Sequence, residues 1–131
     1  MRRSLHYIAT SIATSVLLVA TPAIAHVGIA ATVPVHDAVI ERAPELLRFV
    51  FPGQVTITNV RVLPVDERLV QVGDTINVRL PRNRIGQSTA FGDAIDLAIP
   101  LLPPGTYQVV FQATSIEGHA MADDFTFTIK P

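Results

Sequence analysis

The chain has 131 residues, the size of about one domain, with a formal net charge of −1 and no cysteine. Disulfide bonds and thiol chemistry are therefore excluded, and the fold must be stabilised by its hydrophobic core. The near balance of charge argues against nucleic acid as a partner, because phosphate binding draws on clustered lysine and arginine.

The first 25 residues have the pattern of a secretion signal. Arg2 and Arg3 precede an apolar run at residues 8–20, and residues 23–25 have the small-x-small pattern of a signal-peptidase site. The run is shorter than the roughly 20 apolar residues of a membrane span, so an uncleaved anchor is the less favoured alternative. We expect cleavage after Ala25, by the general secretion route rather than the twin-arginine route.

Cleavage leaves residues 26–131 as the mature domain. Its 106 residues carry eight basic and eleven acidic side chains, a net charge of −3, and contain no second apolar span. We therefore expect an exported, mildly acidic domain without a membrane span.

The mature part has the pattern of an all-β domain, because short runs rich in Val, Ile, Thr and Phe recur between turn-forming residues. Apolar and polar residues alternate most clearly in the last two runs, which predicts two buried rows. The rows are Tyr107, Val109, Phe111 and Ala113, and Phe125, Phe127 and Ile129. The candidate strands cover residues 29–33, 46–51, 56–63, 75–80, 94–98, 106–114 and 124–130.

Turns are expected at residues 52–53, 72–74, 91–93 and 102–105, where Pro, Gly and Asp gather. The stretch from 81 to 93, "PRNRIGQSTAFGD", is the most loop-like, and we expect it to be mobile. About seven short strands in about 100 residues predict an immunoglobulin-like β-sandwich with Greek-key connections.

His26 becomes the first residue after cleavage, and this position changes its chemistry. An N-terminal histidine offers two nitrogens, the α-amine and a ring nitrogen, which close a chelate ring on one metal ion. Their unperturbed pKa values are about 8 and about 6.5, so a metal ion can displace both protons near neutral pH. Cu(II) favours nitrogen and oxygen ligands in a tetragonal arrangement, and His26 would supply half of that plane.

Glu117, Gly118 and His119 form a second candidate element. Residues i and i+2 can point the same way in an extended or turn conformation, so a carboxylate oxygen and a ring nitrogen would complete the set. Three nitrogens and one oxygen suit Cu(II) better than Cu(I), which prefers thiolate and thioether ligands. By itself, an E-x-H triplet is more often a solvated polar turn.

The other histidine of the mature domain, His36, is expected in a solvated turn beside Asp37, a turn former. Contact between its exposed ring and the metal is the alternative.

Two blocks of the sequence resemble the CopC-type copper-resistance family of periplasmic copper-binding proteins. The first, "HVGIAATVPVHDAVIERAPELLRFVF", begins with the mature N-terminal histidine and ends in a strand closing on Phe. The second, "LPPGTYQVVFQATSIEGHAMADDFTFTI", is similar to the family's closing hairpin, with L-x-x-G-x-Y-x-V followed by S-x-D-G-H. Together the blocks cover about half of the mature domain, and the middle matches only in its β character.

The resemblance implies a periplasmic protein that binds one copper ion as Cu(II) through His26, Glu117 and His119. Glu117 stands where the family has Asp, and its extra methylene moves the carboxylate outward and adds a rotatable bond. Asp123 occupies a position usually held by Gly, and Phe111 replaces a core Trp. The methionine-rich Cu(I) segment of some members is absent. A membrane copper transporter or another periplasmic copper protein is the implied exchange partner.

The leading hypothesis is therefore a copper-binding protein for sequestration, transfer or resistance, and not an enzyme. One alternative is a histidine-brace copper oxygenase, but the mature domain has no Trp and only Tyr107 for a sugar-stacking platform. The other is a β-sandwich interaction module without a metal, because a sandwich by itself implies no function.

Overall fold

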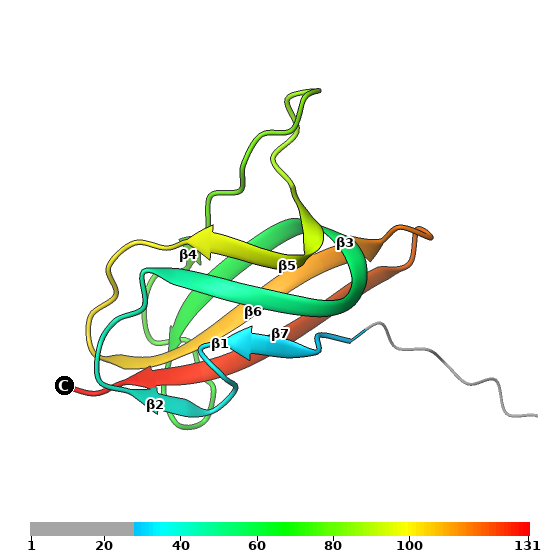
Figure 1. Cartoon of the computed structure of the whole chain (residues 1–131). Helices are drawn as coiled ribbons and strands as arrows, with labels where there is room; N and C mark the ends of the chain where they lie inside the picture. Colours follow the sequence, from blue (N-terminus) through cyan, green and yellow to red (C-terminus); the bar gives the residue numbers. More distant parts are fainter. Residues whose placement is uncertain (1–27) are drawn as a thin grey trace, which may run out of the picture.

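The computed structural model describes residues 28–131, which form seven β-strands and no helix (Figure 1). The predictions of an all-β domain and of about seven strands are confirmed. None of the described residues belongs to a helix long and apolar enough to cross a membrane. The strands are β1 (Ala31–Val33), β2 (Ala38–Ile40), β3 (Leu46–Val65), β4 (Ile76–Asn77), β5 (Ala90–Ala98), β6 (Gly105–Ser115) and β7 (Ala120–Ile129).

The long strand β3 replaces two strands of the sequence prediction. Pro52 and Gly53, expected to reverse the chain, lie inside this single strand of 20 residues. The register with β5 shifts between Val50 and Val55, so the proline and glycine fall at an irregularity of the ladder. Proline cannot donate a ladder hydrogen bond and glycine packs no side chain, which suits a bend within a strand. The prediction of a turn there is wrong.

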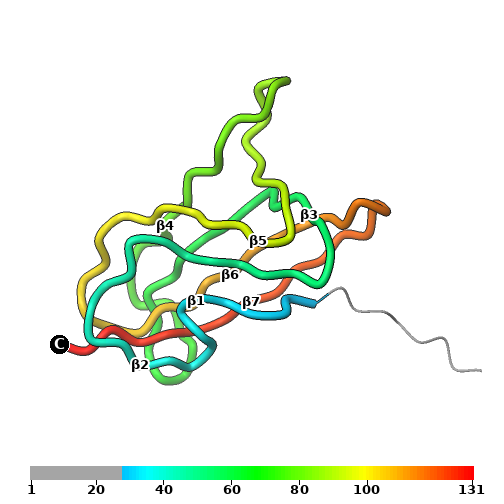
Figure 2. The backbone as a smooth tube through the Cα atoms, viewed as in Figure 1, coloured from blue at the N-terminus to red at the C-terminus, as the bar shows by residue number. Residues whose placement is uncertain are grey.

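The bend lets β3 belong to both layers of a sandwich. Its first part pairs with β1, its second part pairs with β6 and β4, and β5 pairs with it on both sides of the bend. The hydrogen-bonded order β1-β3-β6-β7-β2 therefore forms one path that curls over on itself (Figure 2). The pairings are antiparallel, except that β2 lies parallel to β7.

Aromatic rings join the two layers in the core. Phe49 of β3 meets Phe111 of β6 and Phe125 of β7 edge to face, with ring centroids 5.2 and 5.8 Å apart. Both rows predicted from the alternation of β6 and β7 are buried, which confirms them as core. Phe111, the aromatic that stands in place of Trp, lies at the centre of this cluster.

Two further differences concern short or irregular elements. The turn predicted at residues 91–93 is wrong, because these residues lie in β5 and Gly92 pairs with Val55. Gly92 has a φ of +148°, a conformation that side chains rarely adopt, so this glycine serves an irregular strand. The strand β2 was not predicted, because its three residues are too few to establish an alternating pattern.

One end of the sandwich gathers segments that are distant in sequence. Val50 of β3 pairs with Ala31 of β1, near the start of the described chain. Val55, beyond the bend, pairs with Gly92 on one side and with Ser115 on the other. The start of β1, the base of the 81–89 hairpin and the β6–β7 turn therefore all lie near the bend of β3 (Figure 1).

Candidate metal centre

The predicted ligands Glu117 and His119 lie in the turn that joins β6 to β7. Ser115 N–H donates to the carbonyl oxygen of His119, and Gly118 N–H donates to that of Ser115, both at 2.9 Å. The Ser115 hydroxyl also accepts a hydrogen bond from His119 N–H at 3.1 Å. Gly118 has a φ of +87°, which glycine adopts without strain. The sequence therefore builds a turn that is hydrogen-bonded at both of its ends.

This turn brings the two predicted ligands together. Glu117 Oε2 lies 3.7 Å from His119 Nε2, and the side chains are 78 % and 73 % exposed. Two ligands that each lie about 2 Å from one metal ion are separated by no more than about 4 Å. The spacing of the carboxylate and the imidazole thus fits two ligands of one ion, and their donor atoms suit Cu(II).

The third predicted ligand, His26, lies outside the described residues, as does the predicted cleavage site after Ala25. Within residues 28–131, no three or more His, Cys, Asp or Glu side chains form a group that could hold a metal ion. The structure thus describes two of the three predicted ligands.

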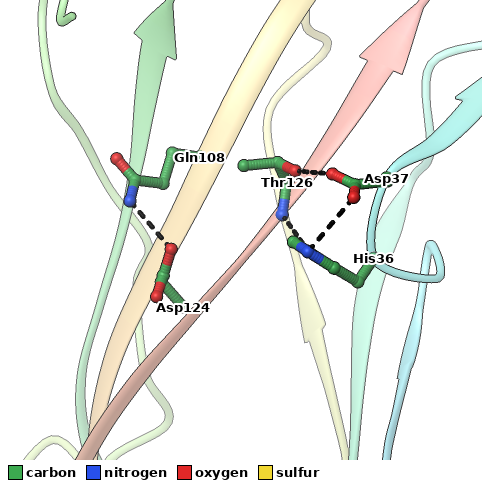
Figure 3. A network of polar contacts seen from close by, with 5 residues as sticks. All are labelled: His36, Asp37, Gln108, Asp124 and Thr126. Atoms are coloured by element: carbon green, nitrogen blue, oxygen red, sulfur yellow. Dashed lines mark hydrogen bonds and ion pairs between the residues drawn. The ribbon is translucent and has the colours of Figure 1, made fainter. Parts of the chain in front are cut away.

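His36 lies far from this pair and is more than a solvated turn residue. Its Nδ1 accepts a hydrogen bond from Thr126 N–H at 3.2 Å, and its Nε2 lies 3.3 Å from Asp37 Oδ2 (Figure 3). Thr126 is six residues along β7 from Ala120, which corresponds to about 20 Å at the rise of a strand. His36 and His119 therefore cannot bind the same ion in this fold.

Asp37 forms the turn that the sequence predicted, with a φ of +61°. Its carboxylate accepts a hydrogen bond of 2.6 Å from the Thr126 hydroxyl, and its backbone N–H donates to the Thr126 carbonyl oxygen at 2.7 Å. His36 and Asp37 together attach the β1–β2 turn to β7. A contact with a residue 90 positions away left no signal in the local sequence.

Neighbouring residues of β7 have other tasks. Met121 packs against the hydrophobic core, opposite Ala113 of β6. Asp123, in the position that the family gives to Gly, accepts a hydrogen bond from the backbone N–H of Asp124 at 2.8 Å. The Asp124 carboxylate accepts another, also 2.8 Å long, from the side-chain amide of Gln108 (Figure 3).

The sequence prediction missed the Ser115 hydroxyl, which accepts the hydrogen bond from His119 N–H. The available signal was its position four residues before His119.

Comparison with known proteins identifies the domain. The sequence model of the CopC domain matches residues 29–130. The chain belongs to the CopC family. The resemblance to the family is thus confirmed, and the match extends through the middle of the domain.

Solved structures of CopC-type proteins have a similar fold. The crystal structure of CopC from Methylosinus trichosporium OB3b is 20 % identical, with a TM-score of 0.53, over 79 % of this chain and 92 % of that one. PcoC, a copper resistance protein from Escherichia coli, is 19 % identical, with a TM-score of 0.55, over 79 % of this chain and 99 % of that one. A search of curated proteins gave no match.

CopC membership supports a copper-resistance protein rather than an enzyme. The copper oxygenase alternative is thereby disfavoured.

Proposed function

We propose that the mature protein binds one Cu(II) ion in the periplasm, for sequestration or for transfer to another copper protein. The proposed ligands are the α-amine and ring of His26, the carboxylate of Glu117 and the ring of His119. Copper is here the cargo of the protein. The exchange partner would be a membrane copper transporter or another periplasmic copper protein.

The pairing of Glu117 with His119 on a hydrogen-bonded turn is the observation that carries this proposal. The turn lies at the end of the sandwich where the described chain begins. Ile29 and Ala30 line one cavity with His36 and with Asp124 and Phe125 of β7, so the start of the chain runs beside the middle of this strand. Asp124 is four residues, about 13 Å, from Ala120 at the start of β7. The span from Gly28 back to His26 is at most about 7 Å, so the proposal requires residues 26–28 to extend along β7 towards the turn.

A Cu(II) titration of the processed protein, followed by electron paramagnetic resonance, tests the proposal. His119→Ala removes a ring nitrogen, so we expect at least a tenfold loss of affinity, about 1.4 kcal/mol or more. His36→Ala is the matched control, because it removes an imidazole about 20 Å from the turn. Copper affinity unchanged in His119→Ala, or equally reduced in both variants, would contradict the site.

A second variant tests the role of the amine. Adding one glycine before His26 keeps the imidazole but moves the free α-amine by one residue, so the chelate ring cannot form in the same way. We expect an altered nitrogen coordination in the resonance spectrum and weaker binding. Mass spectrometry of the exported protein must find His26 as the first residue. Processing at another position would remove the basis of the chelate.

A further inference from the structure

An arginine-bearing hairpin follows β4, leads into β5 and projects from the sandwich (Figure 1). We call residues 81–89 the arginine arm. Its two legs are joined by hydrogen bonds from Thr89 N–H to Pro81 O at 2.9 Å and from Asn83 N–H to Gln87 O at 2.8 Å. Arg82 and Ser88 form a β-bridge between the legs. The sequence predicted only a loop here, and the structure resolves that loop into a hairpin.

The tip of the arm is organised by one side chain. Asn83 Oδ1 accepts hydrogen bonds from Ile85 N–H at 3.1 Å and from Gln87 N–H at 2.9 Å. Gly86 N–H donates to the Asn83 carbonyl oxygen at 3.0 Å, and Gly86 has a φ of +82°. A turn with this many internal hydrogen bonds loses less conformational entropy when it binds a partner than an unstructured loop does.

The arm concentrates positive charge on an acidic domain. Arg79 at its base, Arg82 and Arg84 are exposed, and residues 75–92 contain no Asp or Glu. In residues 28–131 the other basic side chains number five, against eleven acidic ones. The ion pairs of the described chain involve none of the three arginines, whereas Arg48 and Lys130 are both paired. The guanidinium groups of Arg79, Arg82 and Arg84 are therefore available to an external anion.

The arm also carries apolar surface. Ile85 at the tip is 77 % exposed, and Phe91, just past the arm in β5, is 61 % exposed. Arginine and aromatic residues are enriched in protein–protein interfaces, where apolar contacts accompany the charged ones. The combination fits a protein partner better than a simple inorganic anion.

We propose that the arginine arm docks an acidic segment of a partner protein. The planar guanidinium group matches the geometry of a carboxylate and can pair with it through two hydrogen bonds. A positive feature that projects from a negative domain selects a local acidic segment, while the body of the domain repels a broadly acidic surface. Gly92, which follows the arm in β5, pairs with Val55 of β3, and Val55 also pairs with Ser115. The base of the arm and the β6–β7 turn therefore flank the same part of β3.

An anionic membrane is the less favoured occupant. Three basic side chains with the exposed Ile85 and Phe91 form a small anchor, and even a whole acyl chain gives only marginal, reversible membrane binding. A second copy of this chain is the other alternative, and the test must distinguish it from an acidic segment of a partner protein.

Nuclear magnetic resonance titration of the metal-free mature protein tests the proposal. The probe is a synthetic peptide of alternating glutamate and glycine, and the control peptide carries glutamine in place of glutamate. We expect the acidic peptide to shift the backbone amides of the arm and of Phe91, with a response that weakens as salt screens the charges. The control peptide should leave these amides unchanged.

Matched charge reversals decide whether the arm itself binds the acidic peptide. Arg82→Glu with Arg84→Glu should weaken peptide binding about tenfold or more, because two favourable charge pairs become repulsive. Arg42→Glu with Arg68→Glu makes the same change in net charge at two other exposed arginines, and it should change affinity by less than about twofold. Both variants alter exposed side chains, and their amide spectra report directly on folding.

Several outcomes would overturn the docking proposal. The first two are an equal loss of peptide affinity in both double variants and amide shifts spread over the whole domain. Amide shifts with phosphatidylglycerol vesicles but not with the peptide would indicate a membrane instead. Shifts that depend on protein concentration alone would indicate a second copy of this chain. Because the experiment uses metal-free protein, its failure would leave the copper proposal standing. A failed copper titration would likewise leave the arm proposal standing.

Discussion

The hydroxyl of Ser115 fixes the backbone of His119, the residue that carries one of the proposed copper ligands. The bond from His119 N–H to this hydroxyl spans the turn, alongside the backbone bond between the same two residues. Ser115 does not need to contact the metal to influence it, because a group that orients a ligand affects how well the ligand binds. We therefore regard Ser115 as a positioning residue.

Replacing Ser115 tests this role. Ser115→Ala removes the acceptor for His119 N–H, and we expect Cu(II) affinity to fall about tenfold, the lower end of the range for groups that orient metal ligands. Ser115→Thr keeps a hydroxyl in place and should restore most of the affinity and the original resonance spectrum. If Ser115→Ala binds copper like the wild type, the backbone hydrogen bonds alone hold the turn.

At the scale of elements, the start of β6 is fixed by a tyrosine. The Tyr107 hydroxyl donates a hydrogen bond to the carbonyl oxygen of Pro103, four residues earlier. Its ring stacks on Phe127 of β7, with centroids 5.7 Å apart. This arrangement resembles the tyrosine corner of immunoglobulin-like sandwiches, which ties the entry of a strand to the loop before it.

Residues 26–131, the proposed processed protein, contain no other tyrosine and no tryptophan, so Tyr107 can be titrated by ultraviolet absorbance. Burial raises the pKa of the Tyr107 hydroxyl, and the midpoint should lie above the ordinary value of about 10. The folded state thus favours the neutral phenol. Its contribution to stability is present below the unfolded pKa and is lost as the pH rises through the folded pKa.

Tyr107→Phe is the control for this titration. It removes the hydroxyl and should lower the free energy of unfolding by about 1 kcal/mol at neutral pH. Relative to this variant, the wild type should lose stability more steeply in alkaline solution. A phenol midpoint at the ordinary value, or identical alkaline unfolding of the two proteins, would show that burial of the hydroxyl makes no pH-dependent contribution to stability.

The sequence predicted some elements well and others poorly, for identifiable reasons. β6 and β7 alternate regularly because each has one face on the core, so their buried rows could be read directly. The extent of β3 could not be read from the sequence, because Pro and Gly mark both turns and bends. Only the pairing on both sides of the strand decides between a turn and a bend. The nearness of Glu117 to His119 was predicted from a family motif and local spacing, whereas the His36–Thr126 contact depends on the fold.

At the scale of the whole molecule, β3 makes the two layers interdependent. Neither layer contains a complete set of strands without it, since its first part pairs in one layer and its second part in the other. Phe49, on the first part, packs against rings of the second layer at 5.2 and 5.8 Å. Unfolding one layer would expose these rings and break the ladder of the other, so we expect a single cooperative transition.

Phe49→Ala tests this cooperativity. The side chain is fully buried, and a buried Phe→Ala change costs about 3–5 kcal/mol, a large part of the roughly 5–15 kcal/mol that stabilises a typical domain. Phe91→Ala is the matched control, because Phe91 is 61 % exposed in the adjacent strand β5, and its loss should change stability by less than about 0.5 kcal/mol. Urea unfolding followed by circular dichroism and by Tyr107 fluorescence should give coincident curves for every variant. Tyr107 lies in β6 and reports on the layer formed by β6 and β7. A variant whose fluorescence and circular dichroism curves have different midpoints would show that the layers unfold independently.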